Sequence, residues 1–300
     1  MKEENKSRVI YYTRMDPQYP QRMREMENMP GGIYTLGRLP DEKKKSAAIV
    51  GARLCTGYGY EQAYRFAYEL ARAGVEIISG MAQGIDSCAH EGALDAGGST
   101  VAVLGCGVDI CYPASSRRTY ERLQKNGGIL SEYPCGAPPL AFHFPERNRI
   151  ISALADVVLV VEAKKRSGSL ITADLALDQG KSVMAVPGRI TDRLSEGCNW
   201  LISQGAGIAR APSDVLAELG LTEKTAGVDA GAAGVQCTLT AEERCICLAI
   251  REGARTRNAL VGATGIPFSQ VNAALTKLQL SGAVTVSGGE FQCFLEDFKR

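Results

Sequence analysis

The chain has 300 residues, which is enough for one large domain and one small one. Its 34 lysines and arginines balance 33 acidic residues, so the net charge excludes no partner, and an anion site must come from local clustering. No segment approaches the roughly 20 apolar residues of a membrane helix, and the start, MKEENKSRVI, lacks the apolar core of a signal peptide. We therefore expect a cytoplasmic protein with no membrane partner.

Residues 1–45 are mostly polar, and we expect them to be an N-terminal extension that packs on the core. Beyond them, short apolar runs alternate with segments of helical spacing, which predicts a parallel sheet covered on both faces. Residues 46–220 are therefore expected to be α/β, with an extended Rossmann-like, doubly wound, mostly parallel sheet. The expected strands are Ala47–Val50, Val75–Ser79, Thr100–Leu104, Gly128–Ser131, Val157–Val161 and Ser182–Val186, and the expected helices are Tyr60–Ala73, Ser87–Ala96, Ser116–Asn126 and Ser169–Gln179.

Residues 221–237 are small and flexible in composition, which predicts a linker. A small C-terminal domain, residues 238–300, follows it. Thr240 and Glu243 form a capping-box signature at the start of its first helix. Two more helices, Thr256–Ala263 and one from about Pro267 to Leu280, precede a hairpin of Ala283–Val286 and Glu290–Phe294. Three helices and a hairpin are the winged-helix pattern.

Ligands of parallel sheets bind beyond the carboxyl ends of the strands, so the loops that follow the strands are the candidate site. The first strand ends in Gly51-Ala52-Arg53, where glycine lets backbone amides approach an anion and Arg53 adds a bidentate phosphate donor. The alternative is a tight turn with a surface arginine. The second strand ends in a glycine-rich loop that offers Gly80 and Gln83.

Cations also follow the third, fourth and fifth strands. Arg117 and Arg118 come after the third strand. The segment Phe142–Ile151, which we expect to be a loop, places phenylalanines beside arginines, as a single-stranded nucleic acid requires for its bases and phosphates. The fifth strand leads into Lys164, two further cations and a Ser167–Ser169 turn whose amides and hydroxyls would hold an oxyanion. This convergence at one edge predicts an anion site.

Structural alternatives remain open for these loops. The alternative for the phenylalanines is a place in the core, and the alternative for the arginines of the fourth loop is an ion pair with Glu146. The alternative for Arg117 is a solvated helix face. Asp86 either caps the helix that carries His90 or forms an acid–base pair with it, although no nucleophile stands beside them in the sequence.

Two motifs are excluded by their context. Gly180-Lys181-Ser182 lacks the P-loop glycine, since Leu175 stands there, and it follows a helix instead of a strand. Gly57 and Gly59 lack the third glycine of a dinucleotide fingerprint. Ten scattered cysteines without a C-x-x-C pair, and only two histidines, predict no metal site, and no cofactor is expected.

Five segments in collinear order carry a family resemblance: Ser79–Asp86, Ala102–Asp109, Phe144–Ser152, Ser167–Ala173 and Ala185–Gly188. With them, residues 8–219 resemble a bacterial family, DNA-processing protein A (DprA, also called Smf). That resemblance implies an extended Rossmann fold and a homodimer without enzymatic activity. It also implies a single-stranded DNA-binding protein of natural transformation and recombination that protects incoming DNA and loads the RecA recombinase.

Position by position, the resemblance implies that Arg53 and the Ser167–Ser169 turn contact DNA. It implies the same for the Phe144-Pro-Glu-Arg-Asn-Arg149 stretch, where an aromatic ring stacks on a base. Ala52 and Ala141 depart from the family, because a hydroxyl residue is common at the first position and some members have lysine at the second. The candidate DNA-binding residues are therefore Arg53, Gly80, Gln83, Arg117, Phe144, Arg147, Asn148, Arg149, Lys164, Ser167, Gly168 and Ser169.

Two other functions remain as alternatives. A Rossmann-like nucleotide-binding protein or nucleotide hydrolase would use Asp86, His90 and Glu132. A duplex-binding regulator would act through its C-terminal domain, but Phe268–Leu280 offers Lys277 as its only cation, so a protein-interaction or accessory role is favoured for that domain.

Overall fold

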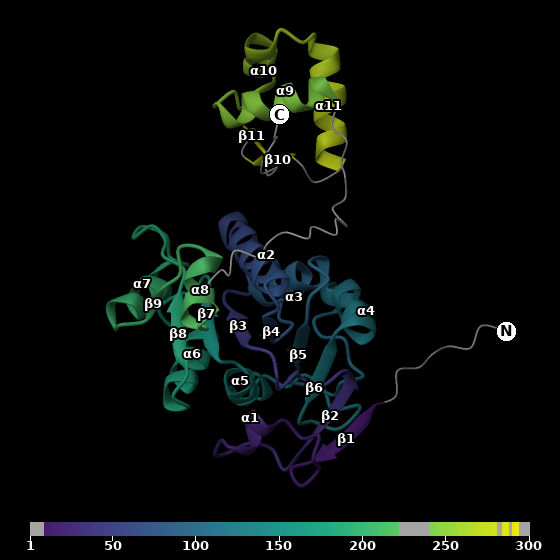
Figure 1. The fold of residues 1–300 in the computed structure, drawn as a ribbon, viewed down its shortest axis with the longest axis vertical. Coiled ribbons are helices and arrows are strands. Elements are labelled where there is room, and N and C mark those ends of the chain that lie inside the picture. The colour runs from purple at the N-terminus through teal and green to yellow at the C-terminus, as the bar shows by residue number, and fades with distance from the viewer. Residues whose placement is uncertain (1–8, 222–239, 281–283, 288–289, 294–300) are drawn as a thin grey trace, which may run out of the picture. The chain divides into compact units, whose positions relative to one another are not determined.

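The computed structural model of the protein describes residues 9–221, 240–280, 284–287 and 290–293 (Figure 1). The chain divides into two compact units, Met1–Ala226 and Gly227–Arg300. Nearly all of the predicted linker, 221–237, lies outside the described residues.

The first unit contains a nine-stranded sheet with the strand order β1-β2-β6-β5-β4-β3-β7-β8-β9. Neighbouring strands from β6 to β9 pair in parallel, whereas β2 pairs antiparallel with β6, and β1 antiparallel with β2. The α/β, mostly parallel fold class is thus confirmed. The strands are β1 Ile10–Thr13, β2 Gly32–Gly37, β3 Ser46–Val50, β4 Glu76–Ser79, β5 Thr100–Val103, β6 Gly128–Ser131, β7 Val157–Val160, β8 Ser182–Ala185 and β9 Gly207–Ile208.

Side chains alternate between the two faces of the sheet and so form two helix-covered cores. In β3, Ala47 and Ile49 pack on one side, while Ala48 and Val50 pack on the other. The helices on the first face are α2 Gly57–Arg72, α3 Ile85–Asp95, α4 Arg117–Asn126 and α8 Pro212–Glu218. Those on the second face are α1 Gln21–Arg24, α5 His143–Leu154, α6 Gly168–Asp178 and α7 Glu196–Ser203.

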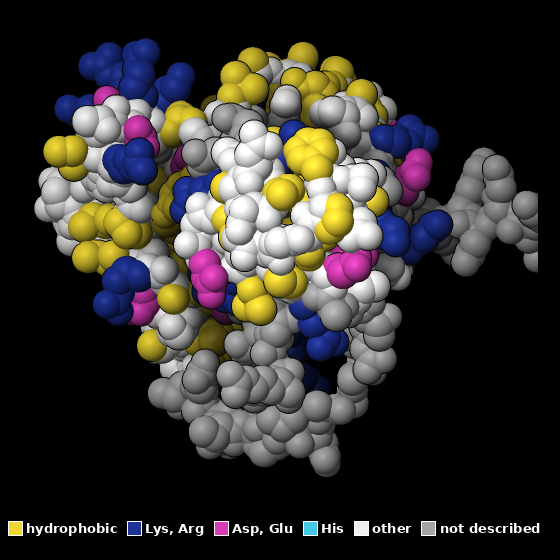
Figure 2. All heavy atoms as spheres, turned by 90° about the horizontal axis from the view of Figure 1, so that it is seen from above, with side chains coloured by type: hydrophobic (Ala, Val, Ile, Leu, Met, Phe, Trp, Pro, Cys, Tyr) yellow, Lys and Arg dark blue, Asp and Glu magenta, His cyan; other side chains and the backbone are white. Residues whose placement is uncertain are grey.

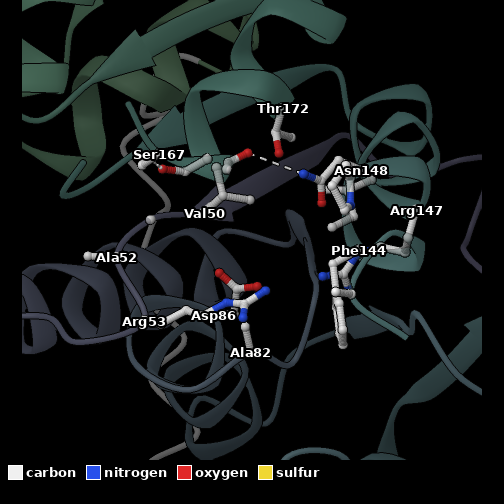
Figure 3. Close-up of a pocket in the computed structure, with 16 residues that line it drawn as sticks. Val50, Ala52, Arg53, Ala82, Asp86, Phe144, Arg147, Asn148, Ser167 and Thr172 are labelled. Carbon is white, nitrogen blue, oxygen red and sulfur yellow. Dashed lines mark hydrogen bonds between the residues drawn. The ribbon is translucent and has the colours of Figure 1, made fainter. Parts of the chain in front are cut away.

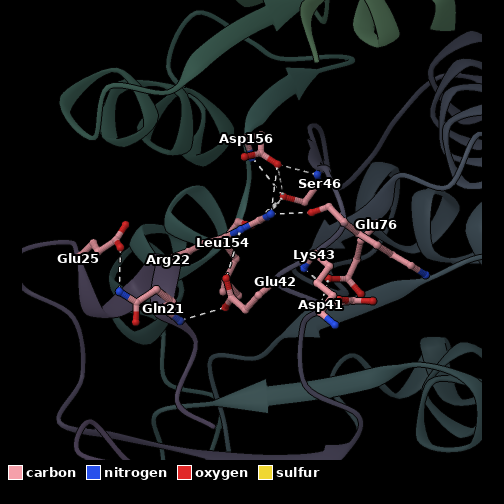
Figure 4. Close-up of polar contacts among 11 residues, drawn as sticks. Gln21, Arg22, Glu25, Asp41, Glu42, Lys43, Ser46, Glu76, Leu154 and Asp156 are labelled. Atoms are coloured by element: carbon pink, nitrogen blue, oxygen red, sulfur yellow. Dashed lines mark hydrogen bonds and ion pairs between the residues drawn. The ribbon is translucent and has the colours of Figure 1, made fainter. Parts of the chain in front are cut away.

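The N-terminal segment is more than an extension on the core, because its strands β1 and β2 belong to the sheet. Arg22 of α1 holds the N-terminal segment against the amino ends of the parallel strands (Figure 4). Its guanidinium donates to the carbonyl of Leu154 at 2.9 Å, to that of Lys44 at 2.6 Å and to the Ser46 hydroxyl. Asp156 accepts from the Ser46 amide at 2.8 Å and lies 3.4 Å from Arg22, which compensates the partly buried arginine.

The prediction of a loop at Phe142–Ile151 was wrong, because helix α5 begins at His143. Pro145 is in the first turn, where a missing amide hydrogen breaks no helical bond. Arg147, Ile150, Ile151 and Leu154 then repeat at helical spacing, and all four are buried.

The second unit contains the predicted winged helix. Its elements are α9 Ala241–Arg251, α10 Arg257–Thr264, α11 Phe268–Leu280, β10 Val284–Ser287 and β11 Glu290–Cys293. Thr240 caps α9 as expected, since its hydroxyl accepts from the Glu243 amide while the Glu243 carboxylate accepts from the Thr240 amide. Leu260, Leu275 and Phe291 bring the helices and the hairpin into one core.

Candidate functional site

A pocket of about 330 Å³ opens where the chain connectivity reverses, between β3 and β7 (Figure 3). The chain fills the sheet from β3 toward β6 on one side and then continues at β7 on the other side, which is the switch point at which such sheets bind ligands. The lining residues come from the loops after β3, β4 and β7 and from the amino-terminal parts of α3, α5 and α6. They include Arg53, Asp86, Phe144, Arg147, Asn148, Ser167, Gly168, Ser169 and Thr172.

Arg53 and Phe144 meet at this pocket although they are far apart in the sequence. Arg53 is exposed, and its guanidinium carbon lies 5.1 Å from the centre of the half-buried Phe144 ring. Phe144 packs over Gly105, where an added Cβ would lie 3.2 Å from the ring. The centre of the Tyr112 ring is 5.4 Å from that of Phe144.

Arg147 differs from the exposed phosphate donor that we expected. It is only 3% exposed, and its guanidinium donates to the carbonyls of Gly80, at 2.7 Å, and Val103. These carbonyls lie at the ends of β4 and β5, so Arg147 ties α5 to the sheet. An added Cβ at Gly80 would lie 2.5 Å from this guanidinium, which explains why glycine stands there.

Asp86 is the buried acid of the pocket. It is in the first turn of α3, after the N-cap Gly84, and accepts from the Gly80 amide at 3.2 Å. Burial raises the pKa of Asp86 to about 6, although the positive charges of Arg147 and Arg53 oppose this shift. Burial likewise lowers the pKa of Arg147 to about 10.

His90 bonds elsewhere than to Asp86. Its Nδ1 is 2.7 Å from the hydroxyl of Thr100, which in turn donates to the Ile77 carbonyl. Burial lowers the pKa of His90 to about 3, so the ring is neutral near neutral pH. The described contacts therefore indicate a structural role for His90, which positions Thr100 at the start of β5.

The turn before α6 has the features of an anion site. Ser167 is the N-cap of α6 but makes no side-chain cap bond, and its hydroxyl is 2.6 Å from that of Ser169. Asn148 of α5 donates to the Gly168 carbonyl at 3.2 Å (dashed in Figure 3). The first amides of a helix carry a partial positive charge, so this turn offers amides and hydroxyls to an anion.

The other candidate residues lie away from the pocket lining or are engaged elsewhere. Arg149 is 2.5 Å from Glu132 and Arg117 is 2.8 Å from Glu121, whereas Glu146 accepts from Tyr133 and from neither predicted arginine. Gly80 is buried, while Gln83 and Lys164 are exposed beside the pocket loops.

Sequence reasoning missed Thr172 and Tyr112. Thr172 is 1% exposed in α6 and lines the pocket one turn after Gly168. Tyr112 follows the third strand's Gly105–Gly107 loop, and its position after a glycine loop at the same sheet edge was the available signal.

A family model described as "DNA recombination-mediator protein A" matches residues 10–220, which hold the sheet and the pocket. The chain belongs to this family. A second model, "DprA winged helix domain", matches residues 230–290. The family resemblance and the winged-helix prediction are both confirmed.

Relatives of this DprA/Smf family align over most of the first unit. The chain is 43% identical over 204 residues to the DNA processing protein DprA of Streptococcus pneumoniae, spanning 68% of this chain and 72% of the relative. It is 45% identical over 202 residues to the protein Smf of Escherichia coli, spanning 67% of this chain but only 54% of that relative.

Two solved structures of DNA processing protein A have the same fold. The S. pneumoniae structure matches with a TM-score of 0.67 and 41% identity over 70% of this chain and 74% of that one. The Helicobacter pylori structure matches with a TM-score of 0.62 and 32% identity over 70% and 95%, and its subject is a single-stranded DNA binding mode.

On the face drawn in Figure 2, lysine and arginine side chains lie in separate groups, and acidic side chains lie beside several of these groups. Within the described residues, we find no cluster of three or more potential metal ligands, and no helix there is both long and apolar enough to span a membrane.

Proposed function

We propose that this DNA recombination mediator binds single-stranded DNA across the β3–β7 pocket. The observation that carries the proposal is the meeting of Arg53, Phe144 and the Ser167–Ser169 turn at one opening, although they come from three separate segments of the chain. The H. pylori relative, whose structure concerns single-stranded DNA binding, supports this ligand.

In this proposal each group has one task. A phosphate accepts from the amides of Gly168 and Ser169 and from the two hydroxyls of the turn, where the dipole of α6 favours negative charge. Exposed Arg53 contacts the next phosphate or stacks on a base while it remains near Phe144. Arg147 and Asn148 hold Phe144 and the turn in position instead of contacting DNA.

A single strand fits this geometry better than a duplex. The aromatic ring of Phe144 is half-buried at the pocket, so only a base free of its partner strand can reach it. The remaining candidates, Arg117, Arg149 and Lys164, then lie along or beside the path; the two arginines contribute less because each already has a carboxylate partner.

The biological role that we propose follows the family. Bound single strands are protected and handed to the RecA recombinase during natural transformation and recombination, in the cytoplasm, by a homodimer that performs no catalysis. The described contacts support a binding role, since His90 and Asp86 are both buried and each bonds a different partner. The winged helix is proposed to contact protein, because Lys277 is the only cation of α11.

A nucleotide-binding protein is the second candidate, because a pocket of about 330 Å³ at a switch point also suits a mononucleotide. Calorimetry separates the two functions. The proposal predicts tight binding of oligo-dT that depends on its length, whereas equally tight binding of thymidine monophosphate would favour the alternative.

A gel-shift comparison tests the ligand itself. We expect the protein to bind a single-stranded oligonucleotide much more tightly than the duplex of the same sequence. Arg53→Ala should weaken single-strand binding for all sequences, while Arg65→Ala, on the exposed face of α2, serves as the matched control. Equal affinity for the two forms of DNA would contradict the proposal.

A further inference from the structure

Tyr112 is an exposed aromatic residue at the edge of the proposed site. It lies between β5 and α4, is 40% exposed, and its ring centre is 5.4 Å from that of Phe144 with an interplanar angle of 38°. Tyr112 is not among the residues that line the pocket, so the function proposed above gives it no task.

The surroundings of Phe144 make this neighbour important. One side of the Phe144 ring packs on Gly105, and the guanidinium carbons of Arg53 and Arg147 are 5.1 and 5.9 Å from its centre. The protein thus covers part of the Phe144 ring, and the rest faces the pocket. At this edge, Tyr112 presents more open aromatic surface than Phe144 does.

The segment that carries Tyr112 is firmly held. The Gly107 amide donates to Ala137 at 2.9 Å, and the Gly136 amide donates to the Asp109 carboxylate at 3.0 Å. The Tyr120 hydroxyl donates to the Val108 carbonyl at 2.7 Å. A ring on such a segment loses little conformational freedom when a ligand binds, which favours affinity.

A cation follows the same segment in the chain. Arg117 is exposed at the start of α4, and its guanidinium pairs with Glu121 at 2.8 Å. A single-stranded nucleic acid requires an aromatic ring for a base and a cation for a phosphate. Tyr112 supplies the ring here, and Arg117 supplies a weaker cation than Arg53 because it already has a carboxylate partner.

We propose that Tyr112 is a second stacking platform, which takes the base next to the one at Phe144 and directs the strand toward Arg117. This inference rests on the proposed single-strand binding and extends its site from the pocket to the start of α4.

Three substitutions at one position test the stacking. Tyr112→Ala should weaken binding of oligo-dT roughly 5- to 150-fold, the range of one lost base–aromatic stack. Tyr112→Phe keeps the ring and should bind like the parent, whereas Tyr112→Leu keeps bulk without a ring and should bind like the alanine variant. Tyr60→Ala, which removes a comparably exposed tyrosine from α2, is the control and should leave affinity unchanged.

The leucine variant decides between stacking and packing. Parental affinity in Tyr112→Leu would mean that the side chain only fills space, and parental affinity in Tyr112→Ala would mean that it does nothing; either result overturns the inference. Thermal melting of each variant identifies a loss of affinity caused by unfolding, in which case the folded phenylalanine and leucine variants still carry the comparison.

Photocrosslinking gives a second readout on the unmodified protein. Oligo-dT with one 5-iodouracil should crosslink to Tyr112 when the adduct is mapped by mass spectrometry, and adducts confined to other aromatic residues would overturn the inference. Parental protein that binds no single strand at all would refute the proposed function together with the inference. A parent that binds, with no role for Tyr112, would refute the inference alone.

Discussion

Replacing Arg147 by methionine should destabilise the first unit strongly while removing no direct DNA contact. The side chain is 3% exposed and donates to two strand-end carbonyls, Gly80 and Val103. Each charge-assisted hydrogen bond contributes about 1.5–3 kcal/mol. Methionine would leave both carbonyls without this donor and the buried Asp86 carboxyl without the positive charge of Arg147. Protonation of Asp86 and the volume of methionine offset part of the loss, so we expect the free energy of unfolding to fall by about 3 kcal/mol.

Fluorescence of Trp200, the only tryptophan of the chain, follows this unit during thermal unfolding. A loss of about 3 kcal/mol corresponds to a melting temperature lower by roughly 6–12 °C for a unit of this size. Arg65→Met is the control, because its exposed pair with Glu69 contributes about 0.5 kcal/mol or less. A folded Arg147→Met protein with parental stability and no single-strand binding would refute the structural role and make Arg147 a DNA contact.

Three further predictions concern the pocket and the second unit. Burial raises the pKa of Asp86 to about 6, so the carboxyl takes up a proton and the pocket loses a negative charge as the pH falls from about 7 to about 5. The affinity for oligo-dT, measured by fluorescence anisotropy, should therefore rise about five-fold over this pH range. Asp86→Asn should abolish that rise. Gly168→Asp should weaken oligo-dT binding at least about ten-fold, because its carboxylate repels phosphate. Gly168→Asn should bind nearly like the parent, because a Cβ at Gly168 meets no atom within 4 Å. Equal losses in the two variants would indicate a steric cause. Deletion of residues 238–300 should leave single-strand binding in a gel shift nearly unchanged, and its loss would place the site in the winged helix.

The strands of the parallel sheet could be predicted because each is buried on both faces. Ile49 and Val50, for example, pack into different cores, so such a strand is a continuous apolar run that the sequence shows directly. Strand β1 was not predicted because it is at the sheet margin, is mostly exposed and carries no such run. Strand β2 was not predicted although it is mostly buried, because its segment Gly32–Gly37 mixes apolar residues with glycine, threonine and tyrosine. Helix α5 was missed because Pro145 and the four polar residues Glu146–Arg149 interrupt the apolar pattern of its first turns.

The sequence could predict which loops meet at the candidate site, but not which partners the side chains of those loops bind. Because parallel strands end at one edge of the sheet, the loop of Arg53 lies near the Ser167–Ser169 turn independently of side-chain contacts. The partners of individual arginines depend on tertiary contacts that no local pattern contains. Arg147 reaches a carbonyl 67 residues earlier in the chain, and Arg149 finds Glu132 instead of the adjacent Glu146.

The salt dependence of oligo-dT binding tests the central claim most directly. If phosphates are held by Arg53 and the α6 turn, log affinity should fall linearly with log salt concentration, and Arg53→Ala should lower the affinity and reduce the slope by about 0.7, the value of one phosphate contact on a single strand. An Arg53→Ala protein with the parental affinity and the parental slope would contradict the assignment of this pocket as the DNA-binding site.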